Sequence, residues 1–485
     1  MKNRFLLVTM CLLLLIGVIS CDNDKNSSIS PSSYSSDYSS ESSISETSES
    51  SEEIRSNDST SISSEEEMEK EGRKGTVKFA SALNSEKEYE FPFIFKENMF
   101  EESSSNFSKD IALFAFGNAL ANDNATMLNK FFADFEFDNL LLSPSYDVEP
   151  TSTSIAFAIA HTKVQDKDLV AVSIRGFSYK LEWIDNFNVG LEGEHAGFSA
   201  RADIVYAALK GYLSLNNYAK DDTLLLINGY SRAGAVANLL GKRANDEEAV
   251  AKKENIYTYT FEAPKGGIGE EQYSNIFNLV NSGDLITCFA PTEYGFTRYG
   301  LDVNIYSENI DEMLVSFDEK LALPTFKSID ANVKNDSDLP QFLINSLLDY
   351  SEESDMPKQV KTREEFVNNY QESLGYALGL FFSLSNETVN KLQADLSAKD
   401  MSDMIGLLLE DGIYNFLKPY LEEDGITYVD EVLRSHANNL TRFVTGPGSN
   451  ILLLAIYDGA LSRMIQMHTP EINYVLLTNY QEPKA

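Results

Sequence analysis

Ser231 occupies the position in this chain that is best suited to nucleophilic chemistry. The segment Asp222–Gly241 reads as a strand, one sharp turn and a helix, with Ser231 at the turn. Gly229 and Ala233 are small enough for such a turn, although the usual pattern has glycine at the second position. A serine held at a corner of this kind can attack a carbonyl carbon once a neighbouring base takes its proton. The same pattern also occurs at ordinary junctions between a strand and a helix, so other residues must decide between the two interpretations.

A serine nucleophile needs an imidazole base, and the chain contains four histidines. In α/β-hydrolases, which use such a turn, the order along the chain is serine, acid, histidine. His161 and His195 precede Ser231 and are therefore excluded. His436 and His468 remain.

His468 is the preferred base of the two. It follows an apolar segment, residues 451–467, that is expected to be helical, and it directly precedes Thr469-Pro470. A side chain at such an exit from a helix can reach the end of another strand. His436 lies within a polar helical segment and is expected to be a solvated surface histidine, so it is the alternative.

Asp284 is the preferred acid. It comes directly after a predicted strand, Ile276–Asn281, and a Ser282-Gly283 turn, which places it at the same edge of the sheet as the serine. An aspartate in this position also commonly stabilises a turn. Glu262 at the end of the preceding strand is the competitor, but it lies close to Pro264 and is expected to brace the site.

Backbone N–H groups are needed to stabilise the oxyanion that forms during attack on a carbonyl. Arg232, the residue after the nucleophile, is expected to supply one. Phe177 is expected to supply the second, because it follows the strand Leu169–Ile174 and a turn at Gly176.

Strand-sized apolar runs alternate with amphipathic helical stretches in the first half of the folded part, which predicts an α/β fold with a mainly parallel sheet and helices on its faces. The amphipathic stretches are Ala200–Leu213 and Ser231–Arg243. The predicted strands are Thr153–Ala160, Leu169–Ile174, Thr223–Asn228, Ile256–Phe261 and Ile276–Asn281.

A large helical insertion is predicted from about residue 305 to residue 450. Within it, Gly375–Phe382 is apolar on nearly all sides. Buried helix packing is the preferred explanation, and a lid over an apolar substrate is the alternative.

Together these residues resemble the class 3 lipase family, the fungal-lipase-like α/β-hydrolases, from about Leu169 to His468. The resemblance implies a serine carboxylic ester hydrolase that acts on a lipid or other ester and needs no cofactor. It also implies that His195 is structural. Phe177 and Tyr230 depart from the family pattern, which often has a serine or threonine and a histidine there; Ser178 is an alternative source of the hydroxyl. The segments that carry the resemblance are Val172–Phe177, Glu182–Phe187, His195–Phe198, Tyr259–Pro264, Asn281–Ile286 and His468–Tyr474.

The amino terminus predicts export. Residues 1–21 combine a charged start, an apolar run and a small residue before Cys21, and Val18–Cys21 resembles a bacterial lipobox. Cys21 is therefore the expected lipidation site, which implies an envelope protein outside the cytoplasm, anchored to a membrane by lipid. A plain secretory signal or an uncleaved anchor is the alternative. Residues 22–73 form a disordered tether rich in serine and glutamate, and residues 74–485 form the hydrolase domain.

The formal net charge of −36 excludes some classes of partner. So negative a chain repels nucleic acid and anionic membrane surfaces. No motif indicates a metal or nucleotide, and the three cysteines, Cys11, Cys21 and Cys288, leave no pair to oxidise in the folded domain. Two other functions stay open: a catalytically weak surface binding protein on a hydrolase scaffold, and a serine peptidase or transacylase.

Overall fold

The computed structural model describes most of the chain beyond the predicted tether. The predicted signal peptide, Cys21 and all but the last two residues of the tether lie outside the described residues, as do Phe177 and Ser178. The described residues are 72–84, 87–176, 180–325, 333–349, 360–399, 401–449 and 460–482.

Seven strands of the described part form one sheet, in the order β11-β9-β7-β6-β5-β4-β3. The strands β5, β6, β7, β9 and β11 pair in parallel, and β4 and β3 continue the sheet through antiparallel pairs. The bounds are β3 Asp138–Leu142, β4 Phe157–Val164, β5 Lys167–Ile174, β6 Thr223–Tyr230, β7 Ile256–Phe261, β9 Ile276–Val280 and β11 Leu301–Asn304. The predicted mainly parallel sheet is therefore confirmed.

The central strands are buried along their whole length. Every residue of β6 and β7 is buried, as expected for parallel strands with helices on both faces. The segment predicted from Thr153 becomes a strand only at Phe157 and continues to Val164. Its polar end was missed because His161 and Thr162 bond to the edge of β3 and the residues before it, which a periodicity argument cannot see.

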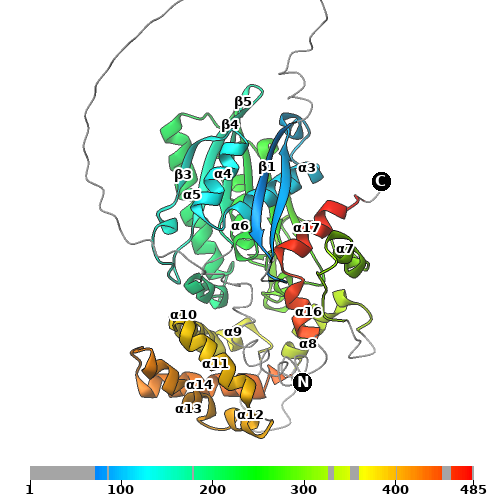
Figure 1. The fold of residues 1–485 in the computed structure, drawn as a ribbon. Helices are drawn as coiled ribbons and strands as arrows, with labels where there is room; N and C mark the ends of the chain where they lie inside the picture. The colour runs from blue at the N-terminus through cyan, green and yellow to red at the C-terminus, as the bar shows by residue number, and fades with distance from the viewer. Residues whose placement is uncertain are drawn as a thin grey trace, which may run out of the picture.

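Helices cover both faces of the sheet (Figure 1). The apolar side chains of α3, α4, α7 and α17 share one core with alternate residues of β4, β6 and β7, and those of α5 and α6 share the other. The helix bounds are α3 Lys109–Ala121, α4 Ala125–Asp134, α5 Ala196–Asn216, α6 Arg232–Glu247, α7 Ile310–Phe317, α16 Ala460–Gln466 and α17 Pro470–Asn479.

A hairpin that the sequence reasoning did not foresee joins the start of the described chain to its end. Its strands, β1 Arg73–Ala80 and β2 Glu88–Phe95, pair in antiparallel register and lie against α3 and α17 (Figure 1). Phe91 stacks on Tyr474 of α17 with ring centroids 4.0 Å apart. The Glu471 carboxyl accepts hydrogen bonds from the Ser81 hydroxyl at 2.7 Å and the Leu83 N–H at 2.9 Å.

Between α7 and α16 the described chain is mainly helical. These helices form three apolar clusters, one of which also includes Leu285 of the sheet region and residues of α16. We call them the helical insertion; they lie below the sheet region in Figure 1. The bounds are α8 Leu339–Leu348, α9 Arg363–Phe366, a π-helical turn at Val367–Gln371, α10 Glu372–Ser383, α11 Asn386–Ala398, α12 Met401–Leu407, α13 Gly412–Glu423 and α14 Asp430–Thr445.

Arg363 anchors the insertion to the sheet region. Its guanidinium donates to five backbone carbonyls in the loop 189–194, including Gly190 at 2.5 Å and Gly193 at 2.7 Å. It also lies 4.4 Å from the ring centre of Phe296. Gln371, two turns later, accepts a hydrogen bond from the Val189 N–H at 3.1 Å. The helix α9 and the π-helical turn that follows it are thus fixed to one loop of the sheet region.

The apolar segment predicted at Gly375–Phe382 forms most of α10. It packs between α14 and the short helix Lys180–Phe187, and a β-carbon at Gly375 or Gly379 would lie against Ile184. Helix packing therefore explains its composition.

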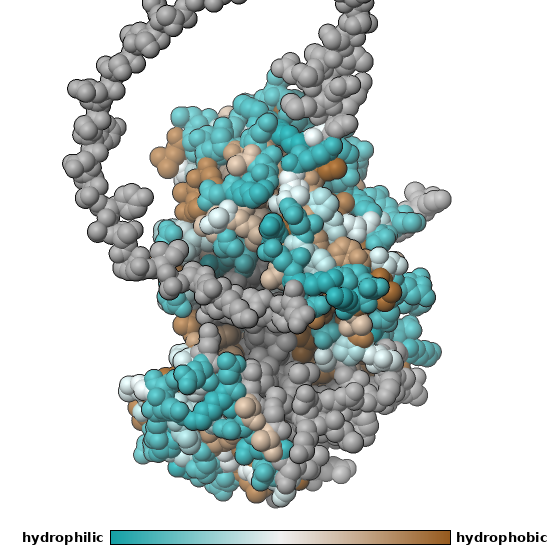
Figure 2. Space-filling model, viewed as in Figure 1, coloured by the Kyte–Doolittle hydropathy of each residue, from teal (hydrophilic) through white to brown (hydrophobic). Residues whose placement is uncertain are grey.

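The fold is that of an α/β-hydrolase with a large helical insertion: a mainly parallel sheet, helices on both faces, and a sharp turn with a serine between β6 and α6. Hydrophilic residues dominate the face seen in Figure 2, over both regions. Among the described residues no helix is both long and apolar enough to cross a membrane.

Candidate active site

Ser231 lies at the turn between β6 and α6 with φ 58° and ψ −131°, a conformation that few residues other than glycine adopt. Its N–H donates to the Phe261 carbonyl of the neighbouring strand at 2.8 Å, which holds the turn in place. The tight turn explains Gly229, because a β-carbon there would come within 2.3 Å of the Ala233 carbonyl oxygen. The predicted strand, turn and helix are confirmed.

The three residues that the sequence singled out meet at one edge of the sheet. His468 Nε2 lies 2.8 Å from the Ser231 Oγ, and His468 Nδ1 lies 2.5 Å from Asp284 Oδ2. His468 and Asp284 are fully buried, and Ser231 is 3% exposed. Asp284 also accepts a hydrogen bond from the Ile286 N–H at 2.8 Å, which orients the carboxylate. A hydroxyl, an imidazole and a carboxyl linked in this order are the groups that acyl transfer by a serine requires.

The backbone that carries His468 is held by side chains from β6, from the residue after β9 and from α17. The Tyr230 hydroxyl donates to the His468 carbonyl at 2.5 Å and accepts from Asn473 at 2.9 Å. The Asn281 side-chain amide donates to the Met467 carbonyl at 3.0 Å. Sequence reasoning noted Tyr230 only as a departure from the family pattern and missed Asn281 and Asn473. Asn281 reaches Met467 across 186 residues and Asn473 reaches Tyr230 across 243, and no local sequence pattern reveals such contacts.

Burial sets the protonation state of the imidazole. It lowers the pKa of His468 to about 4, so this ring is neutral near pH 7 and can accept a proton. Because Nδ1 faces a carboxyl group, Nδ1 carries the ring proton and Nε2 is left to accept the proton of the serine hydroxyl.

Arg232 is the first residue of α6, directly after the serine. The first N–H groups of a helix have no partner within the helix, so they point outward at its positive end. The Arg232 side chain points elsewhere: it is buried and lies 3.6 Å from both Glu182 and Asp185. These acids also pair with Arg175 and Arg201, which explains the charged segment after β5.

Gly176 lies where the sequence predicts the second turn of the oxyanion site. A β-carbon there would come within 2.2 Å of the Tyr230 carbonyl oxygen, so only glycine fits beside the serine turn. Phe177 itself is outside the described residues, so its N–H stays a prediction.

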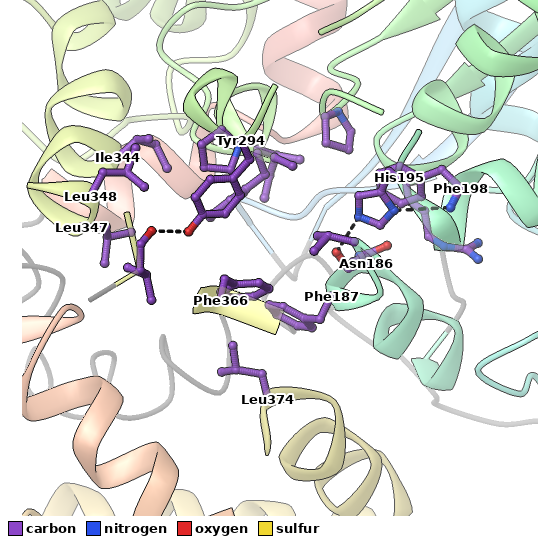
Figure 3. Close-up of a pocket in the computed structure, with 18 of the residues that line it drawn as sticks. Asn186, Phe187, His195, Phe198, Tyr294, Ile344, Leu347, Leu348, Phe366 and Leu374 are labelled. Atoms are coloured by element: carbon purple, nitrogen blue, oxygen red, sulfur yellow. Dashed lines mark hydrogen bonds between the residues drawn. The ribbon is translucent and has the colours of Figure 1, made fainter. Parts of the chain in front are cut away.

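An apolar pocket opens at Ser231 (Figure 3). It encloses about 1230 Å³, its open mouth included. One wall comes from the sheet region, where His195, Phe198 and Asn186 lie together, and Phe187 lies beside Phe366 of α9. The other walls come from α8, α9 and α10 of the insertion. Its main apolar lining residues are Trp183, Phe187, Val189, Phe198, Ile286, Phe289, Tyr294, Leu343, Ile344, Leu347, Leu348, Val360, Phe366, Leu374 and Phe443.

The other histidines have different surroundings. His195 caps α5 by accepting the Phe198 N–H at 3.4 Å, and burial lowers its pKa to about 3, which fits a structural role. His161 lies between Asp138 and Asp168 on β4, away from this site. His436 is half-buried, bonds to Ser373 at 3.0 Å and stacks on Tyr376. The prediction that His436 is solvated is wrong, because α10 packs against its helix.

Glu262, the competing acid, makes no hydrogen bond to His468. Its carboxyl group lies beside that of Asp284. Among the described residues no three acidic, histidine or cysteine side chains gather as a metal site would require.

Comparisons with known proteins give distant structural likeness and no likeness in sequence. No family model matches the chain, and no curated protein is similar to it in sequence. A triacylglycerol lipase described as having a serine-protease triad is 18% identical, with a TM-score of 0.33 over 42% of this chain and 83% of the lipase. Rhizomucor miehei triacylglyceride lipase is 16% identical (TM-score 0.31; 42% and 82% covered), and Rhizopus niveus lipase II is 16% identical (TM-score 0.30; 44% and 81% covered). The fold assignment above rests on the sheet order and the turn at Ser231.

Proposed function

We propose that this protein is a serine-dependent carboxylic ester hydrolase, a lipase or esterase, that acts through an acyl-enzyme. The observation that carries the proposal is the unbroken hydrogen-bonded series from Ser231 through His468 to Asp284, with the serine facing an apolar pocket. A pocket of this character accepts the hydrocarbon part of an ester and excludes the water that would compete with it.

The reaction follows from the positions of these groups. Ser231 Oγ attacks the ester carbonyl carbon while His468 Nε2 takes the hydroxyl proton. The negative charge of the tetrahedral intermediate is stabilised by the N–H groups of Arg232 and Phe177. His468 then gives the proton to the departing alcohol. Water attacks the acyl-enzyme with His468 again as the base, which releases the acid and restores the serine. Asp284 orients the ring and stabilises its positive charge.

The test is hydrolysis of p-nitrophenyl esters of graded chain length by the purified full-length chain. Ser231→Ala should lower kcat by at least about 10^4-fold, because the hydroxyl is the nucleophile. It should leave the unfolding temperature nearly unchanged. The profile of kcat/KM against chain length separates an esterase from a lipase.

A fluorophosphonate probe distinguishes the remaining outcomes. Labelling at Ser231 without ester hydrolysis would point to a peptidase or transacylase. A chain that neither hydrolyses esters nor reacts with the probe would be a binding protein on a hydrolase scaffold, and the proposal would be wrong.

We further propose that the protein acts outside the cytoplasm, anchored by lipid at Cys21. The support is the sequence of residues 1–21. Cells given a labelled fatty acid should incorporate it into the wild-type chain and not into Cys21→Ala. Equal labelling of both chains would contradict the anchor.

A further inference from the structure

Glu262 is a fully buried carboxyl at the end of β7 that the proposed reaction does not use. Its backbone has φ 49°, in the left-handed region where glycine or asparagine is favoured. The backbone at Glu262 is therefore strained, and its side chain lies in the interior beside Asp284. Strain of this kind is retained where the surrounding structure fixes it, and it is frequent at functional sites.

The Glu262 carboxyl has two neighbours that fix it. The Asn281 N–H donates to both of its oxygens, at 3.2 and 3.0 Å. It also forms a side-chain hydrogen bond with Asp284. Two carboxyl groups can share a hydrogen bond only if one of them carries a proton, and two ionised groups at this separation would repel strongly in a buried site.

The surroundings decide which group carries the proton. Glu262 accepts from one N–H, that of Asn281, which favours its ionised form. Asp284 accepts from two separate donors, His468 Nδ1–H and the Ile286 N–H, which favour its ionised form more strongly. Among the described residues, the ionisable groups around Glu262 are Asp284, His468 from the turn between α16 and α17, and Tyr230 from β6.

Arg298 is the cation that acts on Asp284, and its guanidinium is paired with Asp302 and with the Ala263 and Thr287 carbonyls. It therefore does not neutralise a second carboxylate. Burial raises the pKa of Glu262 well above its ordinary value, and the adjacent Asp284 raises it further. Burial also raises the pKa of Asp284, but the hydrogen bonds from Glu262 and the Ile286 N–H oppose that rise.

We propose that Glu262 is a positioning residue that carries a proton at neutral pH and donates it in a hydrogen bond to Asp284, keeping Asp284 ionised and turned toward His468. This role rests on the proposed function, since it acts through the acid of the same site. Glu262 touches no substrate atom in the proposed reaction.

The first test is infrared spectroscopy of the full-length chain in the Ser231→Ala background, which does not depend on turnover. A protonated carboxyl absorbs separately from carboxylates. At pH 7 the difference spectrum between the parent and Glu262→Gln should show the loss of one such band. Spectra with the same protonated-carboxyl absorption in the parent and in Glu262→Gln would show that Glu262 carries no proton and would overturn the proposal.

The second test is the pH profile of kcat/KM. Glutamine keeps a donor toward Asp284 and an acceptor for the Asn281 N–H, so Glu262→Gln should stay within about three-fold of wild type at pH 7. Glu262→Ala, which removes the donor, should lose about ten-fold or more. At alkaline pH wild type should lose activity as Glu262 ionises, and Glu262→Gln should not. A Gln variant as inactive as Asp284→Asn, or one with an unchanged alkaline limb, would also overturn the proposal.

Glu471→Gln is the matched control. Glu471 is another fully buried carboxyl, but it bonds to Ser81 and Leu83 on the hairpin side and not to Asp284. This substitution should leave the alkaline limb where it is in wild type.

The pH dependence of the unfolding temperature tests the proposal even if no ester is hydrolysed. The pKa of Glu262 is higher in the folded than in the unfolded state, so the stability due to its neutral form is complete below about pH 4.5 and declines as pH rises toward the folded pKa. Glu262→Gln should show a smaller decline in unfolding temperature above neutral pH. If this and the lost infrared band are seen without hydrolysis, the proton assignment stands and the proposed function fails.

Discussion

The sheet region and the helical insertion differ in how completely their side chains are buried. Around the serine, the strands β6, β7 and β9 bury every residue. Side-chain hydrogen bonds join Thr260 of β7 to Asn278 of β9 and Ser173 of β5 to Asn228 of β6. In the insertion, α10 buries only Ser373, Leu374, Ala377 and Leu378, and α13 buries three residues. The insertion has small separate clusters where the sheet has two large cores.

This difference in burial matches the difference in how precisely each region must hold its side chains. Three reacting groups must keep their separations to within a fraction of an ångström, so they are carried by the rigid sheet. The insertion contributes pocket walls such as Leu347 and Leu374, which need only be apolar and of suitable shape. On the proposed function, the sheet region carries the reacting groups and the insertion helps to select the substrate.

The largest difference between the two regions is expected when one histidine of each is replaced by alanine. His468→Ala should lower kcat by about 10^4-fold, because the base is lost. His436→Ala in the insertion should stay within about two-fold, since that ring bonds only to Ser373 among the side chains around it that are described. Steady-state kinetics of both variants test this. The reverse pattern would move the chemistry into the insertion.

Removing the anchor of the insertion should have the next largest effect. Arg363→Ala leaves five carbonyls of the loop 189–194 without their donor, which should cost about 3 kcal/mol of unfolding free energy. Thermal unfolding measures the loss. Arg363→Lys should lie between, because an ammonium group has three donors to the guanidinium's five. Two variants as stable as wild type would mean that the insertion does not depend on this contact.

Filling the pocket from the insertion side should change selectivity and not the chemistry. Leu347→Trp should lower kcat/KM for long-chain esters by about ten-fold relative to short-chain esters. Val315→Trp on α7, at an exposed position outside the pocket, is the control and should leave the ratio unchanged. An unchanged ratio in both variants would show that the acyl group binds elsewhere.

The smallest effect is expected at Tyr230, whose hydroxyl holds the backbone of His468. Tyr230→Phe removes the hydroxyl that holds the His468 carbonyl and should lower kcat by a few-fold and stability by about 1 kcal/mol. Tyr259→Phe removes a buried hydroxyl that bonds to the Ser108 N–H, and it should cost similar stability without changing kcat. Equal effects on kcat would mean that Tyr230 acts only through stability.

The sequence was sufficient to predict which three side chains meet in the candidate site. Ser231 and Asp284 follow buried apolar strands, and parallel strands bring such ends to one edge of a sheet. His468 followed from chain order and from its place at the end of a helix. The predicted end of one strand was wrong because β4 continues through two buried polar residues, His161 and Thr162.

Contacts across long separations could not be predicted. Tyr230 meets the His468 carbonyl 238 residues away, and Arg363 meets a loop about 170 residues away. The roles of such residues depend on packing between elements and not on any local period or propensity. Glu262 was weighed as an acid because it ends a strand, but its partnership with Asp284 depends on the register of β7 against β9.

The hairpin against α17 ties the order of synthesis to the assembly of the site. The serine and the acid are made long before the histidine, with the whole insertion between Asp284 and His468. The segment that bears His468 packs on the hairpin of β1 and β2, the first strands of the described part of the chain. A growing chain can thus form much of its sheet before His468 is made, and the Ser231 hydroxyl gains its imidazole partner only when α17 packs against the hairpin.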